Sequence, residues 1–517
     1  MKTKRILLGI FMLFSAFNQI LLAQSVKPDL QYTVSMPQPN SHRFHMELMV
    51  SGMSQDTLLF KMPNWMPGYY QLMHYADNVE NFTVQGAKGE IIPVNKINGN
   101  TWSVTGNKDK SLILSYDVVT KRQFVTNSFL DSTHAYIVPA NNFLYIDGML
   151  DASVSIKIDK QLLPQWNIAT GLEMFSGEPD EFTAPDFDIL YDSPFLIGNL
   201  EELTSFKVKG IDHRFIGYKL GDFDHELFIS NLKKVVEAAI AIFDDIPYKK
   251  YTFIAIGPGR GGIEHLNNTT ISFDGNGIKT KEDMNRMMNF IGHEYFHNYN
   301  VKRIRPFELG PFDYDKENKT TQLWVSEGLS VYYEYIIVKR AGLVDEQTLF
   351  ADFEGNINAV ENNPGRLLQS LSQSSYNTWN DGPFGKRGET ISYYDKGPVV
   401  GLLLDFAIRN ATQNKKSLDD VMRLAYWQYY KKFQRGFTDA EFQEACESIA
   451  GIALTKEFEY IYTTKELDYN KYLNYAGLEI TQEAITENQK KTVKFKIHRL
   501  ENPNPLQSAI LKSWLSE

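Results

Sequence analysis

The sequence predicts a multidomain α+β protein. It indicates an N-terminal β-sandwich-like domain, a second domain with a mixed α/β lobe and a helical lobe, and a short C-terminal β segment. Three observations support this prediction. The 517 residues exceed the roughly 250 to 300 that one hydrophobic core usually holds. Apolar and polar residues alternate from about residue 25 to 203, and helical periodicity dominates from about residue 225 to 475.

The alternating region consists of short runs such as QYTVSM, HRFHMELMVSG and SLILSYDVVT, separated by Gly, Asn, Asp and Pro. Alternation with a period of two places one face of each run against a core, and turn residues at this spacing are typical of a β-sandwich. We expect this domain to be structural and to supply one wall of a cleft.

The pattern changes near residue 205. Two further strand-like runs precede the amphipathic segment HELFISNLKKVVEAAIAIFDDI, which predicts a helix, and the strand KKYTFIAIG follows. The loop at residues 257–273 is glycine-rich but lacks the Lys-Ser/Thr ending of a phosphate-binding loop. Gly261 and Gly262 suit the close approach of an extended peptide to the backbone, so we predict that they bind substrate.

The rest of the chain is predicted to be mostly helical, with Ser417 and Thr438 as N-caps of two of the helices. Strand-like pieces, GLEIT and KTVKFKIHR, return near the end. We therefore divide the chain into a signal peptide at 1–23, a β domain at 24–204, a catalytic domain at 205–475 and a C-terminal β segment at 476–517. The predicted helical segments are 345–361, 398–411, 417–433 and 438–451.

The first residues resemble a secretory signal. Lys2, Lys4 and Arg5 precede a short apolar run, and Ala23 provides a small residue for cleavage. The alternative is a membrane anchor, for which the run is short and interrupted, and no later stretch has the length of a transmembrane helix.

Charge and cysteine content indicate in which cellular compartment the protein acts and which classes of partner it binds. Without the signal peptide the chain has 50 Lys and Arg against 63 Asp and Glu residues, a net charge of −13, which excludes nucleic acid as a partner. Cys446 is the only cysteine, and we interpret it as a buried apolar residue. An exported chain without an intrachain disulfide favours the periplasm or surface of a Gram-negative bacterium.

The strongest chemical motif is His293-Glu294-Tyr295-Phe296-His297. Histidines four residues apart on a helix project to the same side and can bind one cation, with Glu294 placed to act as a base. Thr280 and Asp283 resemble a capping box at the start of this helix. The alternative, a histidine that is an ordinary core residue, is weakened because both histidines lie nearly opposite the apolar stripe formed by Met284, Met287, Met288, Ile291 and Tyr295.

A zinc site of this kind needs a third protein ligand and an open position for water. The candidate is Glu327, in a second helix predicted at residues 321–340, where Leu323 and Val331 lie one turn away on either side. A carboxylate in such apolar surroundings is costly unless a cation is bound to it. The alternative is an exposed glutamate at a helix start that interacts with the helix dipole.

Several separated stretches together resemble the glycyl aminopeptidase family of glutamate-zincin metallopeptidases, which are predicted metalloproteases with a PDZ domain. The matching stretches, which appear in the order of the family, are MPNWMPGYYQLMHYADNVENF, DSPFLIGNL, GGIEH, HEYFHNYNVKRIRPFEL, LWVSEGLSVYYE, SYNTW, ISYYDKG and SLDDVMR.

This resemblance implies a β-rich N-terminal domain, a thermolysin-like catalytic domain and a PDZ domain. It implies one Zn²⁺ per chain on His293, His297 and Glu327, with Glu294 as the general base. It also implies that Tyr394 stabilises the oxyanion, with the adjacent Tyr393 as an alternative, and that Glu264 holds the free amino group of the substrate. Only 42 residues follow Tyr475, so we expect a truncated, partial PDZ-like segment there.

The function that we predict is an exported zinc-dependent aminopeptidase that removes small N-terminal residues, Gly or Ala, from peptides with a free N-terminus. The alternatives are a zinc endopeptidase and a non-catalytic peptide-binding module on the same fold. The sequence indicates no oligomeric state.

Overall fold

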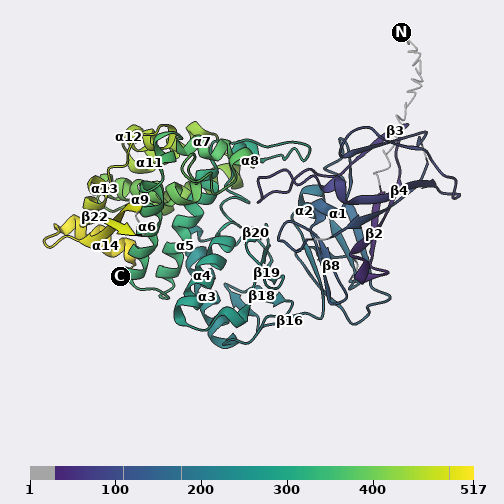
Figure 1. The fold of residues 1–517 in the computed structure, drawn as a ribbon, viewed down its shortest axis with the longest axis horizontal. Coiled ribbons are helices and arrows are strands. Elements are labelled where there is room, and N and C mark those ends of the chain that lie inside the picture. Colours follow the sequence, from purple (N-terminus) through teal and green to yellow (C-terminus); the bar gives the residue numbers. More distant parts are fainter. Residues whose placement is uncertain (1–28, 109, 121, 176, 488–489, 517) are drawn as a thin grey trace, which may run out of the picture.

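The computed structural model describes residues 29–516 except 109, 121, 176, 488 and 489. The predicted signal peptide lies outside these residues. A β-rich lobe and a largely helical lobe lie side by side along the longest axis of the molecule (Figure 1). No helix in the described part of the chain is long and apolar enough to cross a membrane.

The N-terminal domain is β-rich, as its alternating pattern predicts, and its described residues form three sheets. The largest has the strand order β13-β14-β11-β1-β2-β7-β4, and two four-stranded sheets have the orders β10-β3-β6-β5 and β12-β15-β9-β8. The strands are β1 (Asp29–Ser35), β2 (Arg43–Ser51), β3 (Thr57–Lys61), β4 (Val79–Gly86), β5 (Val94–Lys96), β6 (Thr101–Thr105), β7 (Leu112–Val119), β8 (Phe129–Leu130), β9 (His134–Ile137), β10 (Tyr145–Ile146), β11 (Val154–Asp159), β12 (Asn167–Thr170), β13 (Glu173–Met174), β14 (Glu181–Ala184) and β15 (Phe195–Gly198). Two short helices, α1 (Pro139–Asn142) and α2 (Phe187–Tyr191), connect strands of this domain.

The second domain begins with a sheet of order β16-β18-β19-β21-β20, to which β17 adds by pairing with β18. Strands β18, β19 and β21 are parallel, and β20 pairs antiparallel with β21 at one edge. Phe215 and Phe253 pack into the core of the helical lobe, whereas Ile216 and Ile254 belong to the core of the N-terminal domain. The sheet is therefore covered on both faces, because side chains alternate along each strand. Its strands are β16 (Glu201–Glu202), β17 (Phe206–Val208), β18 (Ile211–Gly217), β19 (Lys250–Ala255), β20 (Gly262–Glu264) and β21 (Asn268–Ile271).

The helical lobe follows. Its helices are α3 (His225–Phe243), α4 (Lys281–Phe296), α5 (Leu329–Arg340), α6 (Glu346–Glu361), α7 (Leu371–Tyr376), α8 (Thr378–Asp381), α9 (Tyr393–Ala411), α10 (Leu418–Ala425), α11 (Asp439–Ala450), α12 (Thr455–Tyr462) and α13 (Tyr469–Tyr475). A π-helix at Trp324–Gly328 leads into α5, and a second at Tyr426–Phe433 extends α10. The predicted caps are present, since Thr438 accepts from the backbone N–H of Glu441 and the N–H of Ser417 donates to Asp420.

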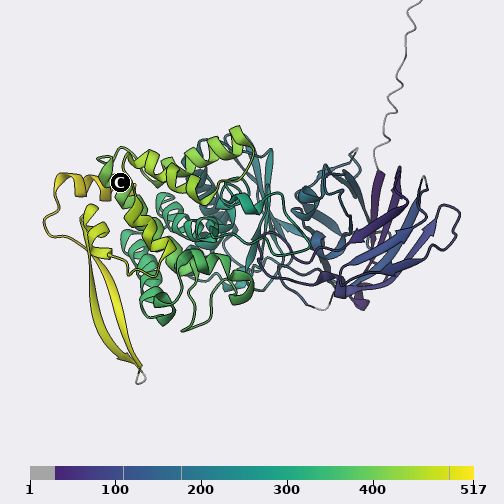
Figure 2. The ribbon, with the colours of Figure 1, turned by 90° about the horizontal axis from the view of Figure 1, so that it is seen from above.

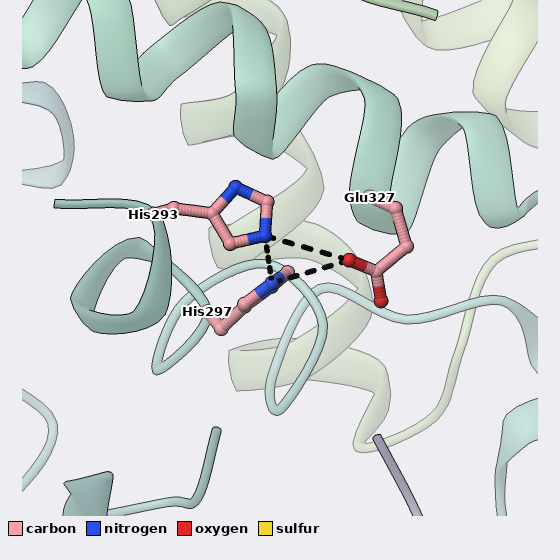
Figure 3. A group of neighbouring side chains, drawn as sticks. All are labelled: His293, His297 and Glu327. Carbon is pink, nitrogen blue, oxygen red and sulfur yellow. Dashed lines mark hydrogen bonds and ion pairs between the residues drawn. The ribbon is translucent and has the colours of Figure 1, made fainter. Parts of the chain in front are cut away.

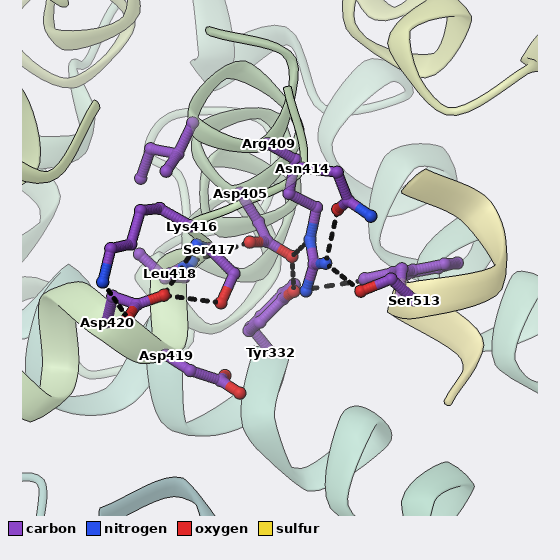
Figure 4. Close-up of polar contacts among 12 residues, drawn as sticks. Tyr332, Asp405, Arg409, Asn414, Lys416, Ser417, Leu418, Asp419, Asp420 and Ser513 are labelled. Carbon is purple, nitrogen blue, oxygen red and sulfur yellow. Dashed lines mark hydrogen bonds and ion pairs between the residues drawn. The ribbon is translucent and has the colours of Figure 1, made fainter. Parts of the chain in front are cut away.

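A buried ion pair holds several of these helices together (Figure 4). Asp405 on α9 accepts hydrogen bonds from Arg409 Nε (2.9 Å), the Tyr332 hydroxyl (2.7 Å) and the backbone N–H of Leu418 (2.7 Å). Arg409 also donates to Ser513 Oγ of the last helix at 2.9 Å. Because each group has several partners, the cost of burying the two charges is offset.

Helix α9 begins five residues earlier than the predicted segment 398–411. Pro398 has no N–H, so the carbonyl oxygen of Tyr394 lacks its usual helical hydrogen bond. For this reason the sequence pattern made Pro398 resemble the first residue of a helix. In the structure Asn356 Nδ2 donates to that carbonyl at 3.4 Å. The early start places Tyr393 and Tyr394 on the first turn of α9.

The C-terminal segment forms a hairpin of β22 (Leu478–Glu487) and β23 (Lys490–Arg499), followed by helix α14 (Pro505–Leu515). The hairpin projects from the helical lobe (Figure 2). The two strands were predicted, but α14 was not, although Asn504 and Gln507 form a capping box at its start. The PDZ-like nature of this segment stays a prediction.

Candidate metal centre and active site

Helix α4 carries the HExxH motif on its last turns. It begins with the predicted capping box, in which Thr280 Oγ1 accepts from the N–H of Asp283 at 3.1 Å and Asp283 accepts from the N–H of Thr280 at 2.8 Å. Tyr295 packs in the core, as expected for the apolar stripe. His293 and Glu294 lie on the final turn and His297 follows as the C-cap residue.

The structure brings the three predicted metal ligands together (Figure 3). Nε2 of His293 lies 2.9 Å from Nε2 of His297, and Oε2 of Glu327 lies 3.6 Å and 3.3 Å from these two nitrogens. All three side chains are buried. The alternatives, a core histidine of the usual kind and an exposed helix-start glutamate, do not describe this arrangement.

The opposite ring nitrogens of the two histidines face acceptors. His297 Nδ1 lies 2.7 Å from the carbonyl oxygen of Asn300, and His293 Nδ1 lies 2.9 Å from Oε2 of Glu334. Such partners favour the tautomers in which Nδ1 carries the proton and Nε2 presents a lone pair. Two lone pairs and a carboxylate then converge on one buried point.

This donor set fits a cation. Nitrogen and carboxylate donors suit Zn²⁺, and a bound cation removes the repulsion between the converging lone pairs. Burial alone would raise the pKa of Glu327, but in the absence of a cation the protonated imidazoles of His297 and His293 hold the pKa of this carboxyl well below its ordinary value. Glu327 is therefore an anion in this site.

Close packing of two glycines positions Glu327 against α9. A Cβ atom on Gly328 would lie 2.7 Å from the Cα of Gly397, and one on Gly397 would lie 2.6 Å from the Cα of Gly328. The π-helix and α9 can therefore approach at this point only without side chains. This approach brings Tyr394 to the metal-ligand group.

The two candidate tyrosines have different partners. The hydroxyl of Tyr394 donates to Oε2 of Glu327 at 2.9 Å, whereas the hydroxyl of Tyr393 lies 3.0 Å from Thr378 Oγ1 and is fully buried. Burial and the charge of Glu327 raise the pKa of Tyr394 well above its ordinary value, so its hydroxyl stays protonated and can donate. The geometry favours Tyr394 over Tyr393.

Strand β20 passes directly over Glu294. A Cβ atom on Gly262 would lie 2.5 Å from the carboxyl carbon of Glu294, so only glycine fits between the strand and the helix. Gly261 has a φ of 88°, in the region that favours glycine, and lies beside Val125 of the N-terminal domain. Both predicted glycines line the cleft.

Glu294 is buried, and its Oε2 has no hydrogen-bond partner among the described residues. Burial raises the pKa of Glu294 to about 7 against the lowering effect of His293 and His297, and the negative charge of Glu264 raises it further. A carboxylate with this affinity for protons is suited to accept one from water.

An open cleft of about 890 Å³ runs past these groups. One wall comes from β20 and α4, a second from α5, α6 and α9, and a third from the N-terminal domain. The residues of this third wall, which the sequence did not identify individually, are Gly68, Tyr69, Tyr70, Gln71, Phe124 and Val125. The expectation that the β domain supplies one wall is confirmed.

Glu264 lies in a smaller cavity of about 70 Å³ that shares Gly68 and Tyr70 with the cleft. Its Oε1 is buried and has no hydrogen-bond partner among the described residues. A Cβ atom on Gly68 would lie 2.8 Å from Glu264 Oε2, so a loop of the N-terminal domain closes over this carboxylate. A buried carboxylate with a free oxygen can accept an ammonium group.

Residues next to Glu264 are fixed to the N-terminal domain. Asp192 accepts from the N–H of Leu266 at 2.7 Å, lies 3.1 Å from Nδ1 of His265, and pairs with Lys302 at 2.5 Å. Sequence reasoning did not identify Asp192, although it lies in one of the matching stretches, DSPFLIGNL. Glu334, the partner of His293, was also missed, although it ends the stretch LWVSEGLSVYYE.

Solved structures share this fold. An aminopeptidase N family protein from Idiomarina loihiensis is 24% identical with a TM-score of 0.83, over 89% of this chain and 81% of that one. An M1 zinc metallopeptidase from Deinococcus radiodurans, solved as a mutant bound to a Tyr-Ser-Ala substrate, is 11% identical with a TM-score of 0.52, over 86% of this chain and 96% of that one. These likenesses establish the fold, a multidomain α+β protein with a β-rich N-terminal domain and a largely helical second domain.

Family models identify the chain more narrowly. Residues 31–199 match the Peptidase M61 N-terminal domain, and residues 286–400 match the M61 glycyl aminopeptidase domain. The two matches together cover more than half of the chain, which belongs to the M61 glycyl aminopeptidase family and is a peptidase. No curated protein sequence matches it. The resemblance to this family noted in the sequence is confirmed, and its PDZ part stays a prediction.

Proposed function

We propose that this protein is a zinc-dependent aminopeptidase that removes small N-terminal residues, Gly or Ala, from peptides. The observation that carries the proposal is the buried convergence of His293, His297 and Glu327 beside Glu294. The preference for Gly follows the family description, glycyl aminopeptidase, and Ala is added as the next smallest side chain.

In this proposal His293, His297 and Glu327 hold one zinc ion per chain. Bound zinc would polarise the scissile carbonyl and lower the pKa of a water towards about 7. Glu294 takes a proton from the attacking water and later delivers it to the leaving amine. The hydroxyl of Tyr394 donates to the charge that develops on the carbonyl oxygen.

Substrate position is set by the walls of the cleft. Gly261 and Gly262 let an extended peptide approach the edge strand β20 closely. Glu264 pairs with the free ammonium group in the cavity under Gly68, which would make the enzyme an exopeptidase. The free oxygen of Glu264 favours this assignment over an endopeptidase.

We also propose that the chain is exported, with residues 1–23 removed, and that it acts in the periplasm or at the surface of a Gram-negative bacterium. The proposed mature domains are residues 24–204, 205–475 and 476–517. These boundaries follow the composition of the chain.

The test is hydrolysis of glycyl and alanyl arylamides, each with a free and with an acetylated amino group, by the zinc-loaded protein. We expect hydrolysis of the free amines only, and Glu264→Gln should lower kcat/KM for them by about 100-fold, because a buried charge-assisted contact is lost. Cleavage of the acetylated compounds at a similar rate would point to an endopeptidase. If the protein could not be loaded with zinc and hydrolysed neither set of compounds, the peptide-binding module would remain.

A further inference from the structure

Two arginines line the cleft on its β20 and α4 walls. Arg260 lies two residues before the start of β20, and Arg286 lies on α4. Among the residues that the structure describes, the Arg260 side chain forms no hydrogen bond or ion pair, and it is exposed. Arg286 is also exposed and pairs with Asp283. An unpaired guanidinium at a peptide-binding cleft is available for an anionic group of the substrate.

Both arginines lie on the side of Glu294 away from Glu264. Strand β20 and helix α4 run in the same general direction. Gly262 lies over Glu294, and just beyond the ends of the two elements Arg303 donates to the carbonyls of both Leu266 (2.9 Å) and Asn298 (2.5 Å). One end of the cleft is therefore lined both by the residues before Gly262 and by the residues before Glu294.

The separation between Arg260 and Glu264 suits a short peptide. Arg260 is four residues before Glu264, so their Cα atoms lie at most about 13 Å apart, and less because the chain turns at Gly261. A tripeptide in extended form spans about 10 Å and a tetrapeptide about 14 Å. A peptide with its ammonium group at Glu264 thus places its terminal carboxylate within reach of the flexible Arg260 side chain.

We propose that Arg260, with Arg286 as a second contact, binds the terminal carboxylate of free tripeptides and tetrapeptides. The proposal rests on the proposed aminopeptidase function and narrows its substrates from peptides in general to short peptides with two free ends. Arg260 and Glu264 then act as the two ends of one binding site, and the scissile bond lies between them above Glu294.

The opposite wall of the cleft is acidic. Glu334, Asp352 and Asp395 belong to α5, α6 and α9, whereas a peptide that pairs with β20 lies along the wall that carries the arginines. Glu334 is engaged with His293, and burial together with the charge of Glu334 raises the pKa of Asp352 to about 7. Asp352 therefore carries only part of a negative charge near neutral pH.

The experiment measures binding without turnover. In the zinc-loaded Glu294→Gln protein, calorimetry gives the Kd of Gly-Gly-Ala and of its C-terminal amide. We expect the free acid to bind about tenfold or more tightly than the amide, as for other charge-assisted contacts. Arg260→Gln in the same background should raise the Kd of the acid to that of the amide, and Arg286→Gln should have a smaller effect in the same direction.

Lys234→Gln is the matched control, since Lys234 is exposed on α3 and does not line the cleft, and it should keep the difference between acid and amide. Equal affinities of acid and amide, or an equal loss for both in Arg260→Gln, would overturn the proposal. Arylamide hydrolysis by the wild-type protein tests the proposed function separately, because an arylamide has no terminal carboxylate.

Discussion

The metal-ligand group and the Glu264 end of the cleft are assembled in different ways. His293 and Glu294 lie on the last turn of α4, and His297 follows as its C-cap residue. Glu327 joins them through Asn300, which donates to the backbone carbonyls just before Glu327. The Glu264 cavity, in contrast, needs a loop from the other domain, in which Gly68 lies against the carboxylate. The first region is local to the helical lobe, and the second exists only where two domains meet.

This difference predicts that chemistry and substrate binding can be separated by mutation. Substitutions in the metal-ligand group should abolish metal binding and with it all activity. Substitutions at the domain interface should weaken the binding of substrates with a free amino group without changing metal binding. The following four changes test this separation.

Glu327→Ala should have the largest effect. It removes one of the three ligands. Loss of an outer-shell partner alone lowers metal affinity by about 10- to 100-fold. We therefore expect loss of a ligand to lower zinc affinity by more than this and to abolish measurable hydrolysis. Competition with a chelating indicator measures the affinity. As a reference, wild-type protein stripped with a chelator should lose activity and regain it with zinc. A variant that binds zinc as tightly as wild type would contradict the ligand assignment.

Tyr394→Phe should reduce kcat by about 100-fold, the usual effect of losing one donor to a developing oxyanion, with little change in zinc content. Tyr393→Phe is the matched control, because it removes an adjacent hydroxyl that contacts Thr378. Steady-state kinetics on glycyl arylamide compares the two. A larger loss in Tyr393→Phe than in Tyr394→Phe would reverse the assignment.

Glu334→Gln should lower zinc affinity by about 10-fold or more, because it weakens the acceptor next to Nδ1 of His293. Asp352→Asn, which lines the same cleft without contacting His293, should leave zinc affinity unchanged. Equal affinities in Glu334→Gln and wild type would show that Glu334 does not support the ligand.

Gly68→Ala should have the smallest effect, about a tenfold lower kcat/KM for free-amine substrates with unchanged zinc affinity. The added methyl group would meet the carboxylate of Glu264, and φ at this position is +92°. Gly89→Ala isolates the backbone strain, since its φ is +80° and nothing lies within 4 Å of the added atom. Equal losses of activity in both variants would argue against a role for the contact with Glu264.

The parts of the fold that depend on local sequence were predictable. Periodicity identified α3, α4, α6 and α11, and alternation identified the β domain, because these patterns reflect which side of an element is buried. Helices α12 and α13 were missed, and α9 was started at Pro398 when it begins at Tyr393. That error has a tertiary cause, since Asn356 from another helix satisfies the carbonyl that the proline leaves free.

The same distinction applies to the site. The metal-ligand group could be predicted because two ligands share a helix and the third lies in a buried apolar helix. The contact between Gly68 and Glu264 could not, because it joins residues nearly 200 positions apart across a domain interface. The choice between Tyr393 and Tyr394 also required the structure, since only the start of α9 decides which hydroxyl faces Glu327.

The most direct test of the central claim is zinc content and arylamide hydrolysis, measured side by side in wild-type and Glu294→Gln protein. We expect about one zinc per chain in both proteins. The rate of hydrolysis should be at least about 100-fold lower in Glu294→Gln than in the wild type. Full activity of Glu294→Gln, or active wild-type protein without a bound metal, would contradict it.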